Sequence, residues 1–506
     1  MDFTVKKDSI NGCEANTVSS AEHTVDCDIT LPEYMPDVVR VLRCCLAPSV
    51  ASQQISGDRI MTECDCTASV IYICEQGKVH CFEQTEHFGK QLEFNGEYQD
   101  SVSVGIKTEF VNYRVSSSRK VEIHGAVSLA AVGLGKRQKE IVSCAEGDGM
   151  TVRAKNMNVC TLSSFAGKAF QVSETCEINC SEKIAAVLSV NHFIRTDEAK
   201  AIHGKLFIRG EMSVRTVCLT ETCEIRCFEN SVPVNQIVDV PDIAEENIIQ
   251  TDINVTSVSV RPRAEQTGDR GLLEIEATLY ISVRAYEMRE IAIVRDAYST
   301  KYETETEMRT VGINTSCEKL YDTFLCRESI DISSVGIQKV LSFECSNIVS
   351  SVSVNDGAVS LSGSITADCI FEDTNSEIYY VTRQIPFEYK HPTVYENMSS
   401  SSISVAVSAY NYALGTGGAL DVRIEIIVNG LVFCGTEEKA VTEITIDKSK
   451  CKSVKTASLT VYFADENECV WDIARHYNTT VEAILRENRM QNEEITHCCK
   501  LLIPKI

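Results

Sequence analysis

The sequence predicts a mainly β protein, built from three tandem β-rich, sandwich-like modules of about 150 residues and a small βααβ domain at the end. Three observations support this fold class. Apolar and polar residues alternate with period two along most of the chain. A long segment occurs three times. The last fifty or so residues change to helical spacing.

The repeat is marked by glycines that open equivalent segments, Gly57, Gly204 and Gly357, at intervals of 147 and 153 residues. After each glycine, alternating residues, a short polar loop and more alternating residues predict a β-hairpin. A second hairpin pattern follows at a matching distance. The period is too long for a solenoid, and each copy is large enough to bury its own core.

Each copy is expected to begin with a strand and a short helix before its two hairpins. The strand patterns are "VDCDITLPE", "FQVSETCEI" and "FLCRESIDI". The predicted helices are Pro36–Leu42, Ser181–Val190 and Val335–Phe343. Pro36 suits a first helical position, where its missing N–H would have no partner.

The repeat sets the predicted boundaries. We expect β modules at 1–145, 146–300 and 301–447, a basic linker at 448–456 and the terminal domain at 457–506. The linker is short and contains lysines, so some mobility of the terminal domain is expected.

Composition limits the classes of partner. The formal net charge is −24 and the pI is about 4.9, which disfavours nucleic acid and anionic lipid as partners. The opening stretch "MDFTVKKDSING" lacks the apolar core of a secretory signal. Apolar stretches such as 126–135 are about half of a membrane span. We therefore expect a cytoplasmic protein without membrane insertion.

The 24 cysteines are expected to be reduced thiols that act as small apolar residues. No C-x-x-C occurs, and Cys64 and Cys66 would share one face of a strand. Zinc sites usually need paired knuckles with such spacing. We predict neither a metal site nor a cofactor.

No catalytic motif is present. Residues 133–135 read Gly-Leu-Gly but lack the frame of a phosphate-binding loop, and neither G-x-S-x-G nor H-E-x-x-H occurs. Acidic residues fall at alternating strand positions or in turns, as solvated charges do. The sequence predicts that the protein is not an enzyme and has no catalytic residues.

The terminal segment predicts two helices on a two-stranded sheet. Its strands are Ser458–Ala464 and Lys500–Pro504. The first helix carries an apolar stripe at helical spacing: Val470, Ile473, Ala474 and Tyr477. Thr479 and Glu482 form a capping box for the second helix, whose inner face is Val481, Ile484 and Leu485.

The stretch "DITLPEYMPDVVRVLRC" (Asp28–Cys44) closely resembles the start of the SPOCS module, and the terminal segment resembles a LysM domain. The second and third copies lack "LPEYMPD" and resemble divergent modules. This order of modules is similar to that of the SipL-like spore-coat morphogenetic proteins of clostridia. The resemblance implies a non-enzymatic scaffold of spore-coat assembly in the mother-cell cytoplasm, at the forespore surface. It also implies that the LysM domain docks a SpoIVA-type coat-basement ATPase or another spore-coat protein.

LysM domains generally bind N-acetylglucosamine-containing glycans in a groove between two loops. Where the family has Gly-Asp-Thr/Ser this chain has Asn467, Glu468 and Cys469, and His497-Cys498-Cys499 replaces Pro-Gly-Gln. Glycine allows close backbone approach to a ligand, and cysteine caps a helix poorly. These departures favour a LysM scaffold that binds protein. The alternative is a protein that binds peptidoglycan glycan through the same domain.

The predicted groove residues are Asn467, Glu468, Cys469, Trp471, Arg489 and Met490. Trp471 is the single tryptophan of the chain and lies beside the buried stripe. It either covers the small core or acts as a contact anchor, a role in which tryptophan is enriched at interfaces.

Overall fold

The computed structural model describes residues 3–94, 101–267, 270–331, 336–355, 357–415, 419–452 and 459–505. In these residues antiparallel strands dominate, and two short helices lie near the C-terminus. The predicted mainly β class is confirmed, with many small antiparallel sheets and two helices beside a strand pair.

Among the described residues, eighteen strands precede the C-terminal domain, in three successive sets of six. The first six are β1 (Thr4–Thr30), β2 (Arg40–Ser56), β3 (Arg59–Ile73), β4 (Val79–Glu93), β5 (Val102–Ser117) and β6 (Lys120–Glu146). The next six are β7 (Met150–Ile178), β8 (Ile184–Ile202), β9 (Lys205–Thr220), β10 (Ile225–Asp239), β11 (Ile248–Thr267) and β12 (Arg270–Ser299). The last six are β13 (Tyr302–Asp331), β14 (Ile337–Asn355), β15 (Ala358–Asp373), β16 (Ile378–Val394), β17 (Met398–Leu414) and β18 (Ala419–Cys451).

Each set of six strands forms two three-stranded sheets with the same strand order. The first, sixth and fifth strands make one sheet, and the second, third and fourth strands make the other. Apolar side chains from all six strands meet in one core in each set. We call these units sandwich 1 (β1–β6), sandwich 2 (β7–β12) and sandwich 3 (β13–β18).

The repeated glycines lie in the turns between the second and third strands of each set. Their φ angles are +62° at Gly57, +78° at Gly204 and +73° at Gly357. Glycine adopts this left-handed conformation without the steric cost that a Cβ brings. The same turn in each sandwich therefore accounts for the regular spacing of these residues.

The three short helices predicted before the first hairpins are wrong. Strand β2 begins at Arg40 after a loop, while β8 and β14 begin at Ile184 and Ile337; Val335 lies outside the described residues. These segments are rich in valine and isoleucine, whose branched side chains fit a pleated sheet. Each strand also pairs along its length with its neighbour, which outweighs a weak local helical pattern.

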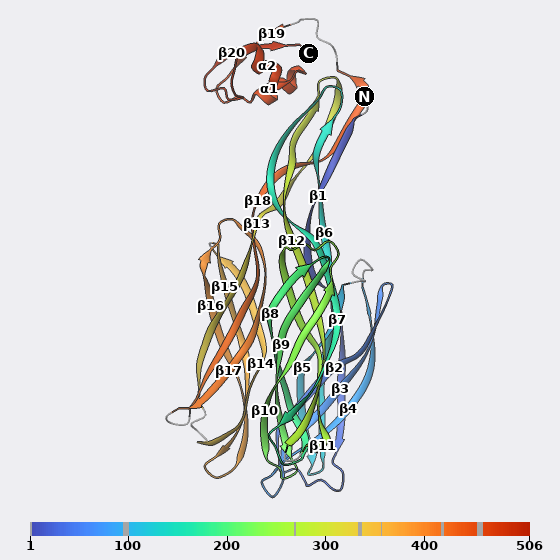
Figure 1. Ribbon diagram of the computed structural model, residues 1–506, viewed down its shortest axis with the longest axis vertical. Helices are drawn as coiled ribbons and strands as arrows, with labels where there is room; N and C mark the ends of the chain where they lie inside the picture. The colour runs from blue at the N-terminus through green and yellow to red at the C-terminus, as the bar shows by residue number, and fades with distance from the viewer. Residues whose placement is uncertain are drawn as a thin grey trace.

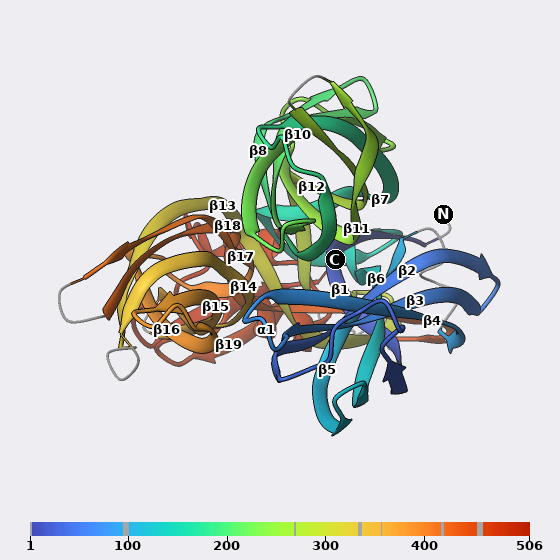
Figure 2. The same cartoon turned by 90° about the horizontal axis from the view of Figure 1, so that it is seen from below.

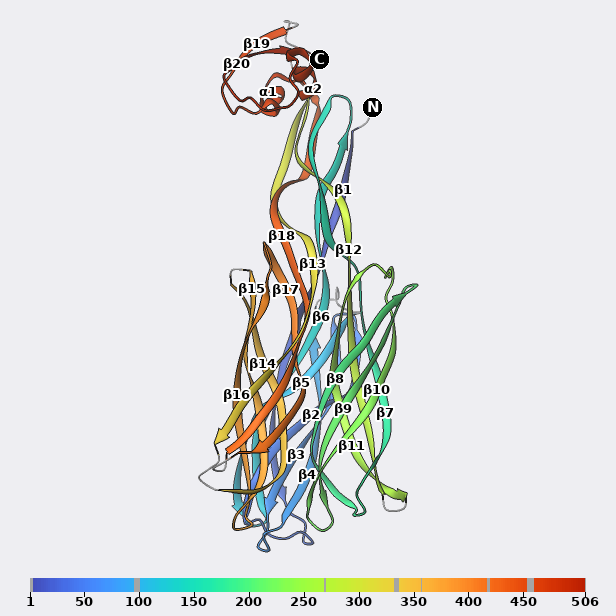
Figure 3. The ribbon, with the colours of Figure 1, turned by 60° about the vertical axis from the view of Figure 1, so that its left-hand side comes forward.

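The first and sixth strands of each set are far longer than the predicted strand openings, at 27 to 33 residues. Each pair forms a two-stranded ribbon that continues beyond its sandwich. The three ribbons, β1/β6, β7/β12 and β13/β18, run together as a narrow column, which we call the stalk (Figures 1 and 3).

The stalk core contains one fully buried valine from each ribbon: Val142, Val294 and Val441. Each valine is followed by a β-bulge residue that has no opposite residue in the register of its ribbon: Ser143, Arg295 and Thr442. A bulge adds one residue and resets the alternation of inward and outward side chains. Ala297 and Ile444, three residues after their valines, therefore return to the same core.

The three sandwiches surround a common axis, as the view along the stalk shows (Figure 2). Their second sheets meet in one further apolar cluster. Leu42 and Ile71 come from sandwich 1, Leu188 and Val217 from sandwich 2, and partly buried Tyr380 from sandwich 3. The repeats are therefore packed around one axis with shared cores at two levels.

The C-terminal domain consists of β19 (Leu459–Ala464), α1 (Val470–Tyr477), α2 (Val481–Asn488) and β20 (Cys499–Pro504). The predicted stripe on α1 is confirmed, since Val470, Ile473 and Ala474 are buried and Tyr477 packs against them. Strand β19 pairs antiparallel with β20. The domain lies at the free end of the stalk (Figure 1).

Two local predictions for this region need correction. The N-cap of α2 is Thr480, whose hydroxyl accepts the Ala483 N–H, whereas Thr479 is buried one residue earlier. Strand β18 continues to Cys451, so residues 448–451 of the expected linker are part of the stalk. Residues 453–456 of that linker lie outside the described residues.

The stalk core predicts a large effect of one substitution. Ile293→Ala removes a side chain that is fully buried among residues of all three ribbons. We expect the free energy of unfolding to fall by about 2–5 kcal/mol, measured by urea denaturation. Met308→Ala is the control, because this stalk side chain is 53% exposed and its loss should change stability by less than about 0.5 kcal/mol. Equal effects of the two substitutions would contradict the shared core.

Candidate functional site

The two loops predicted to border the groove lie together at one end of the C-terminal domain. The Asn467 N–H donates to the Ile495 carbonyl at 2.8 Å, and Cys469 forms an isolated β-bridge with Glu494. Asn467 has a φ of +65°, which turns the chain toward α1. The arrangement brings the first loop against the segment that follows α2.

Glu468 is held inside its own loop. Its carboxylate accepts the Tyr462 hydroxyl at 2.5 Å and the Asp465 N–H at 3.0 Å. The hydrogen bond to this carboxylate raises the pKa of Tyr462 to about 12. Glu468 therefore orders the loop, and its two oxygens are already engaged.

The remaining predicted loop residues have different surroundings. Cys469 is the N-cap of α1 but makes no capping hydrogen bond. Arg489 is exposed and ends α2 with a φ of +54°, and Met490 is half-buried against the domain core. In the second loop, the side chain of Arg489 is therefore more accessible to a partner than that of Met490.

Trp471, one of the predicted groove residues, is buried and not open to the groove. Its side chain is only 4% exposed, because it is covered by the stalk. The indole N–H donates to the Asp296 carboxylate at 2.8 Å, and the ring meets Tyr298 edge to face with centroids 5.0 Å apart. Trp471 is a contact anchor, but its partner is a strand of the same chain, β12.

Other contacts complete this junction, which we call the dock. Arg475 donates to the same Asp296 carboxylate at 2.9 Å, and the Tyr298 hydroxyl donates to the Thr479 carbonyl at 2.8 Å. Arg153 on β7 donates to the Cys469 sulfur at 3.5 Å and pairs with Glu493 at 4.0 Å. The dock opposes the mobility expected for this domain, since contacts from α1 and both loops converge on one ribbon.

Sequence reasoning missed the stalk side of the dock. The bulge aligns "IVSCAE" at the end of β6 with "IVRDAY" at the end of β12, so that Tyr298 stands where sandwich 1 has Glu146. The large aromatic side chain of Tyr298, in place of the carboxylate of Glu146, was the sequence signal that another part of the protein covers the end of this ribbon. Its partner could not be identified from strand alternation.

One face of the C-terminal domain points away from its helices and carries an apolar row. Leu459, Val461 and Phe463 alternate along β19 and are 41%, 47% and 76% exposed. Leu502 lies opposite Val461 on β20. Among the described residues of the domain, Leu459, Val461 and Phe463 are the large hydrophobic side chains that are exposed.

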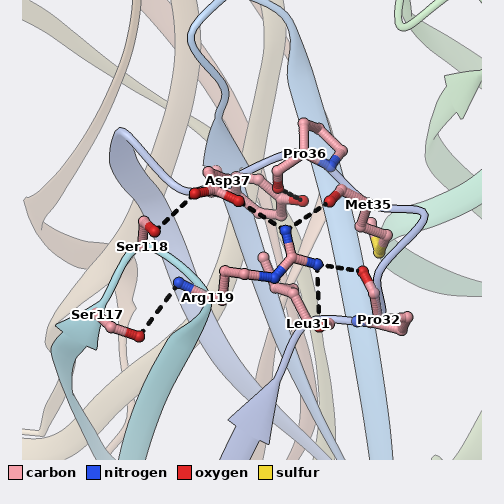
Figure 4. Close-up of polar contacts among 9 residues, drawn as sticks. Leu31, Pro32, Met35, Pro36, Asp37, Ser117, Ser118 and Arg119 are labelled. Atoms are coloured by element: carbon pink, nitrogen blue, oxygen red, sulfur yellow. Dashed lines mark hydrogen bonds and ion pairs between the residues drawn. The ribbon is translucent and has the colours of Figure 1, made fainter.

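The motif "LPEYMPD" forms a second ordered feature, at the loop between β1 and β2 (Figure 4). The Arg119 guanidinium donates to the carbonyls of Pro32 at 2.6 Å, Met35 at 3.2 Å and Leu31 at 3.3 Å. It also pairs with Asp37 at 2.6 Å. We call this arrangement the Arg119 clamp.

The clamp fixes a loop whose tip is open to solvent, because Tyr34 is 84% exposed. Hydrogen bonds from Ser118 and Arg119 lower the pKa of Asp37. Because the pKa of Asp37 is lowered, its ion pair with Arg119 stabilises the fold at pH values above the ordinary pKa of a carboxyl group. This stabilisation is lost as the pH falls through the lowered pKa.

Within the described residues, no group of three or more His, Cys, Asp or Glu side chains is arranged to hold a metal ion. None of the helices described is long and apolar enough to cross a membrane. Cys64 and Cys66 are both buried on β3, as their spacing predicted, and burial raises the pKa of each thiol.

The clamp predicts a local change in Arg119→Lys, because an ammonium group cannot serve three carbonyls and a carboxylate in the fixed fork of arginine. Amide hydrogen exchange should accelerate at Leu31, Met35, Val38 and Val39, measured by mass spectrometry. Arg270→Lys, which alters an exposed ion pair with Glu177, is the control. It should leave the exchange of these four amides unchanged. Unaltered exchange in Arg119→Lys would show that the loop is ordered by other contacts.

The dock predicts a spectroscopic change, because the single tryptophan reports on it. Asp296→Ala removes the acceptor for the Trp471 N–H and should expose the ring to water. We expect the fluorescence emission to shift to longer wavelength while far-ultraviolet circular dichroism stays unchanged. Asp472→Ala, an exposed carboxylate on the same helix, is the control. Emission that stays at the wild-type wavelength in Asp296→Ala would contradict the dock.

Comparisons with known proteins bear on the sandwiches. Residues 37–116 and 183–262 match the family model described as SipL, SPOCS domain. These segments contain β2–β5 of sandwich 1 and most of β8–β11 of sandwich 2, including their second sheets. No curated protein matches the chain. The SPOCS domain is therefore detected twice in this chain, in the same part of two successive sandwiches.

Proposed function

We propose that the protein is a non-enzymatic scaffold in spore-coat assembly. The observation that carries this proposal is the pair of SipL, SPOCS matches in sandwiches 1 and 2. Sandwich 3 has the same strand order, which supports treating it as a divergent third module. Shared cores would hold three such modules in one fixed arrangement, as a scaffold requires.

The proposed partner contact is the C-terminal domain, with a SpoIVA-type coat-basement ATPase or another spore-coat protein as partner. The dock supports a presenting role for the stalk, because it holds the domain at the end of a long column. The dock also uses Trp471, so the partner surface proposed here includes exposed Arg489 and the apolar row Leu459, Val461 and Phe463. Exposed apolar side chains grouped on one face are typical of protein-binding surfaces.

The second candidate is binding of peptidoglycan glycan through the loops of a LysM-like domain. Contact between the two loops, through Asn467 and Ile495, favours this candidate. The engaged Glu468 carboxylate and the contact between Arg153 and Cys469 disfavour it, because a sugar would need polar groups that these contacts use.

A binding experiment separates the two candidates. The full-length chain is applied to immobilised SpoIVA-type ATPase and to an N-acetylglucosamine polymer. We expect the ATPase to retain it. The binding free energy should weaken by about 1 kcal/mol or more in Phe463→Ser and in Arg489→Glu.

The matched control is Phe207→Ser, which alters a partly exposed phenylalanine on β9 of sandwich 2, 39% exposed. It should leave capture unchanged. Retention on the glycan polymer alone would support the second candidate. Capture by the ATPase that survives both substitutions but is lost with Phe207→Ser would move the partner surface to the sandwiches.

A further inference from the structure

A cavity of about 1020 Å³ lies where the three ribbons leave their sandwiches. All three units contribute to its wall: β1 and β6 from sandwich 1, β7 and β12 from sandwich 2, and β13, β17 and β18 from sandwich 3. We call it the junction cavity. Its size lies in the range of sites that hold small molecules.

Arg284 on β12 lines this cavity and is only 7% exposed. Its Nη2 pairs with the Asp252 carboxylate, and its Nη1 donates to the Ser402 hydroxyl at 2.9 Å. Its Nε has no hydrogen-bond partner among the described residues. Leaving a buried charged donor unsatisfied is costly, so this edge of the guanidinium is suited to an acceptor from outside the chain.

Ser402 on β17 supplies a second donor at the same place. Its oxygen accepts from Arg284 and from the Gln250 amide at 3.0 Å. A hydroxyl has two acceptor positions and one proton, so with both positions used the proton is left to donate. Asn11, across the cavity on β1, has a buried Oδ1 without a partner among the described residues. Rotation of its side-chain amide can place either the oxygen or the NH2 group at this position.

The charges around the cavity are locally balanced, although the whole chain has a formal charge of −24. The wall contains three cationic side chains, Arg137, Lys139 and Arg284, and two carboxylates, Glu14 and Glu437. Glu14 pairs with Arg137 at 2.6 Å and Asp252 pairs with Arg284, so these groups carry no net negative charge that would repel an anion. Charge-assisted hydrogen bonds from a buried guanidinium are among the stronger polar contacts in proteins.

We propose that the junction cavity binds a small oxyanion, a phosphate or carboxylate, with Arg284 Nε–H and the Ser402 hydroxyl as its anchoring donors. Arg284 belongs to sandwich 2 and Ser402 to sandwich 3, and residues of sandwich 1 line the opposite wall. The ligand would therefore join all three units at the base of the stalk. This inference concerns a site separate from the C-terminal domain and does not depend on the proposed function.

The test is isothermal titration of the full-length protein with inorganic phosphate and, in a second arm, with succinate at equal ionic strength. The two arms distinguish a phosphate from a carboxylate ligand. We expect one site per chain in at least one arm. Arg284→Lys keeps the charge beside Asp252 but removes Nε–H, and binding should weaken about tenfold, as the loss of one charged hydrogen bond predicts.

Arg43→Lys is the matched control, because Arg43 also pairs with a carboxylate between sandwiches, at 3.3 Å from Asp368, but does not line this cavity. It should bind as wild type does. A measurement on wild type alone adds a readout that needs no variant: the bound ion should slow alkylation of Cys13, a cavity thiol, followed by mass spectrometry. No binding in either arm, or equal affinity in wild type and Arg284→Lys, would overturn the proposal.

Discussion

The structure depends on the burial of apolar side chains between three β-ribbons that come from distant parts of the chain. Ile141, Ile293 and Ala440 are fully buried, each on a different ribbon, in one stalk cluster. A two-stranded ribbon has little stability in water by itself, so each ribbon needs the other two to cover its apolar face. Polar contacts add to this constraint: Lys155 on β7 and Arg295 on β12 both pair with Glu438 on β18, and they lower its pKa.

This constraint links the repeat to the proposed role. Three copies in one chain guarantee that three ribbons meet, without the concentration dependence of a trimer of separate chains. The asymmetry between copies then becomes useful. Tyr298 and Asp296 distinguish the ribbon of sandwich 2 as the attachment point of the C-terminal domain, while the Arg119 clamp belongs to sandwich 1. Threefold architecture would provide rigidity, and differences among the copies would provide specific contacts.

Local pattern allowed prediction of the hairpins, the turn glycines and the stripe on α1, because these follow from nearest-neighbour alternation and helical spacing. The stalk could not be predicted in this way. It rests on contacts between residues such as Asn11 and Thr161, which lie 150 positions apart, and on bulges that interrupt the alternation. For the candidate site, the sequence identified Trp471 as a residue able to anchor a contact. It could not show that Asp296 and Tyr298 of the same chain are the residues that Trp471 contacts.

The most direct test of the shared stalk is hydrogen exchange measured by mass spectrometry on wild type and on Ile293→Ala. Exchange of amides in β6, β12 and β18 is compared across the stalk segments of all three strands. If the ribbons stabilise one another, one substitution on β12 will speed exchange in all three strands, since opening one ribbon uncovers the other two. Faster exchange confined to β12 and its partner β7, with β6 and β18 as protected as in wild type, would contradict the account.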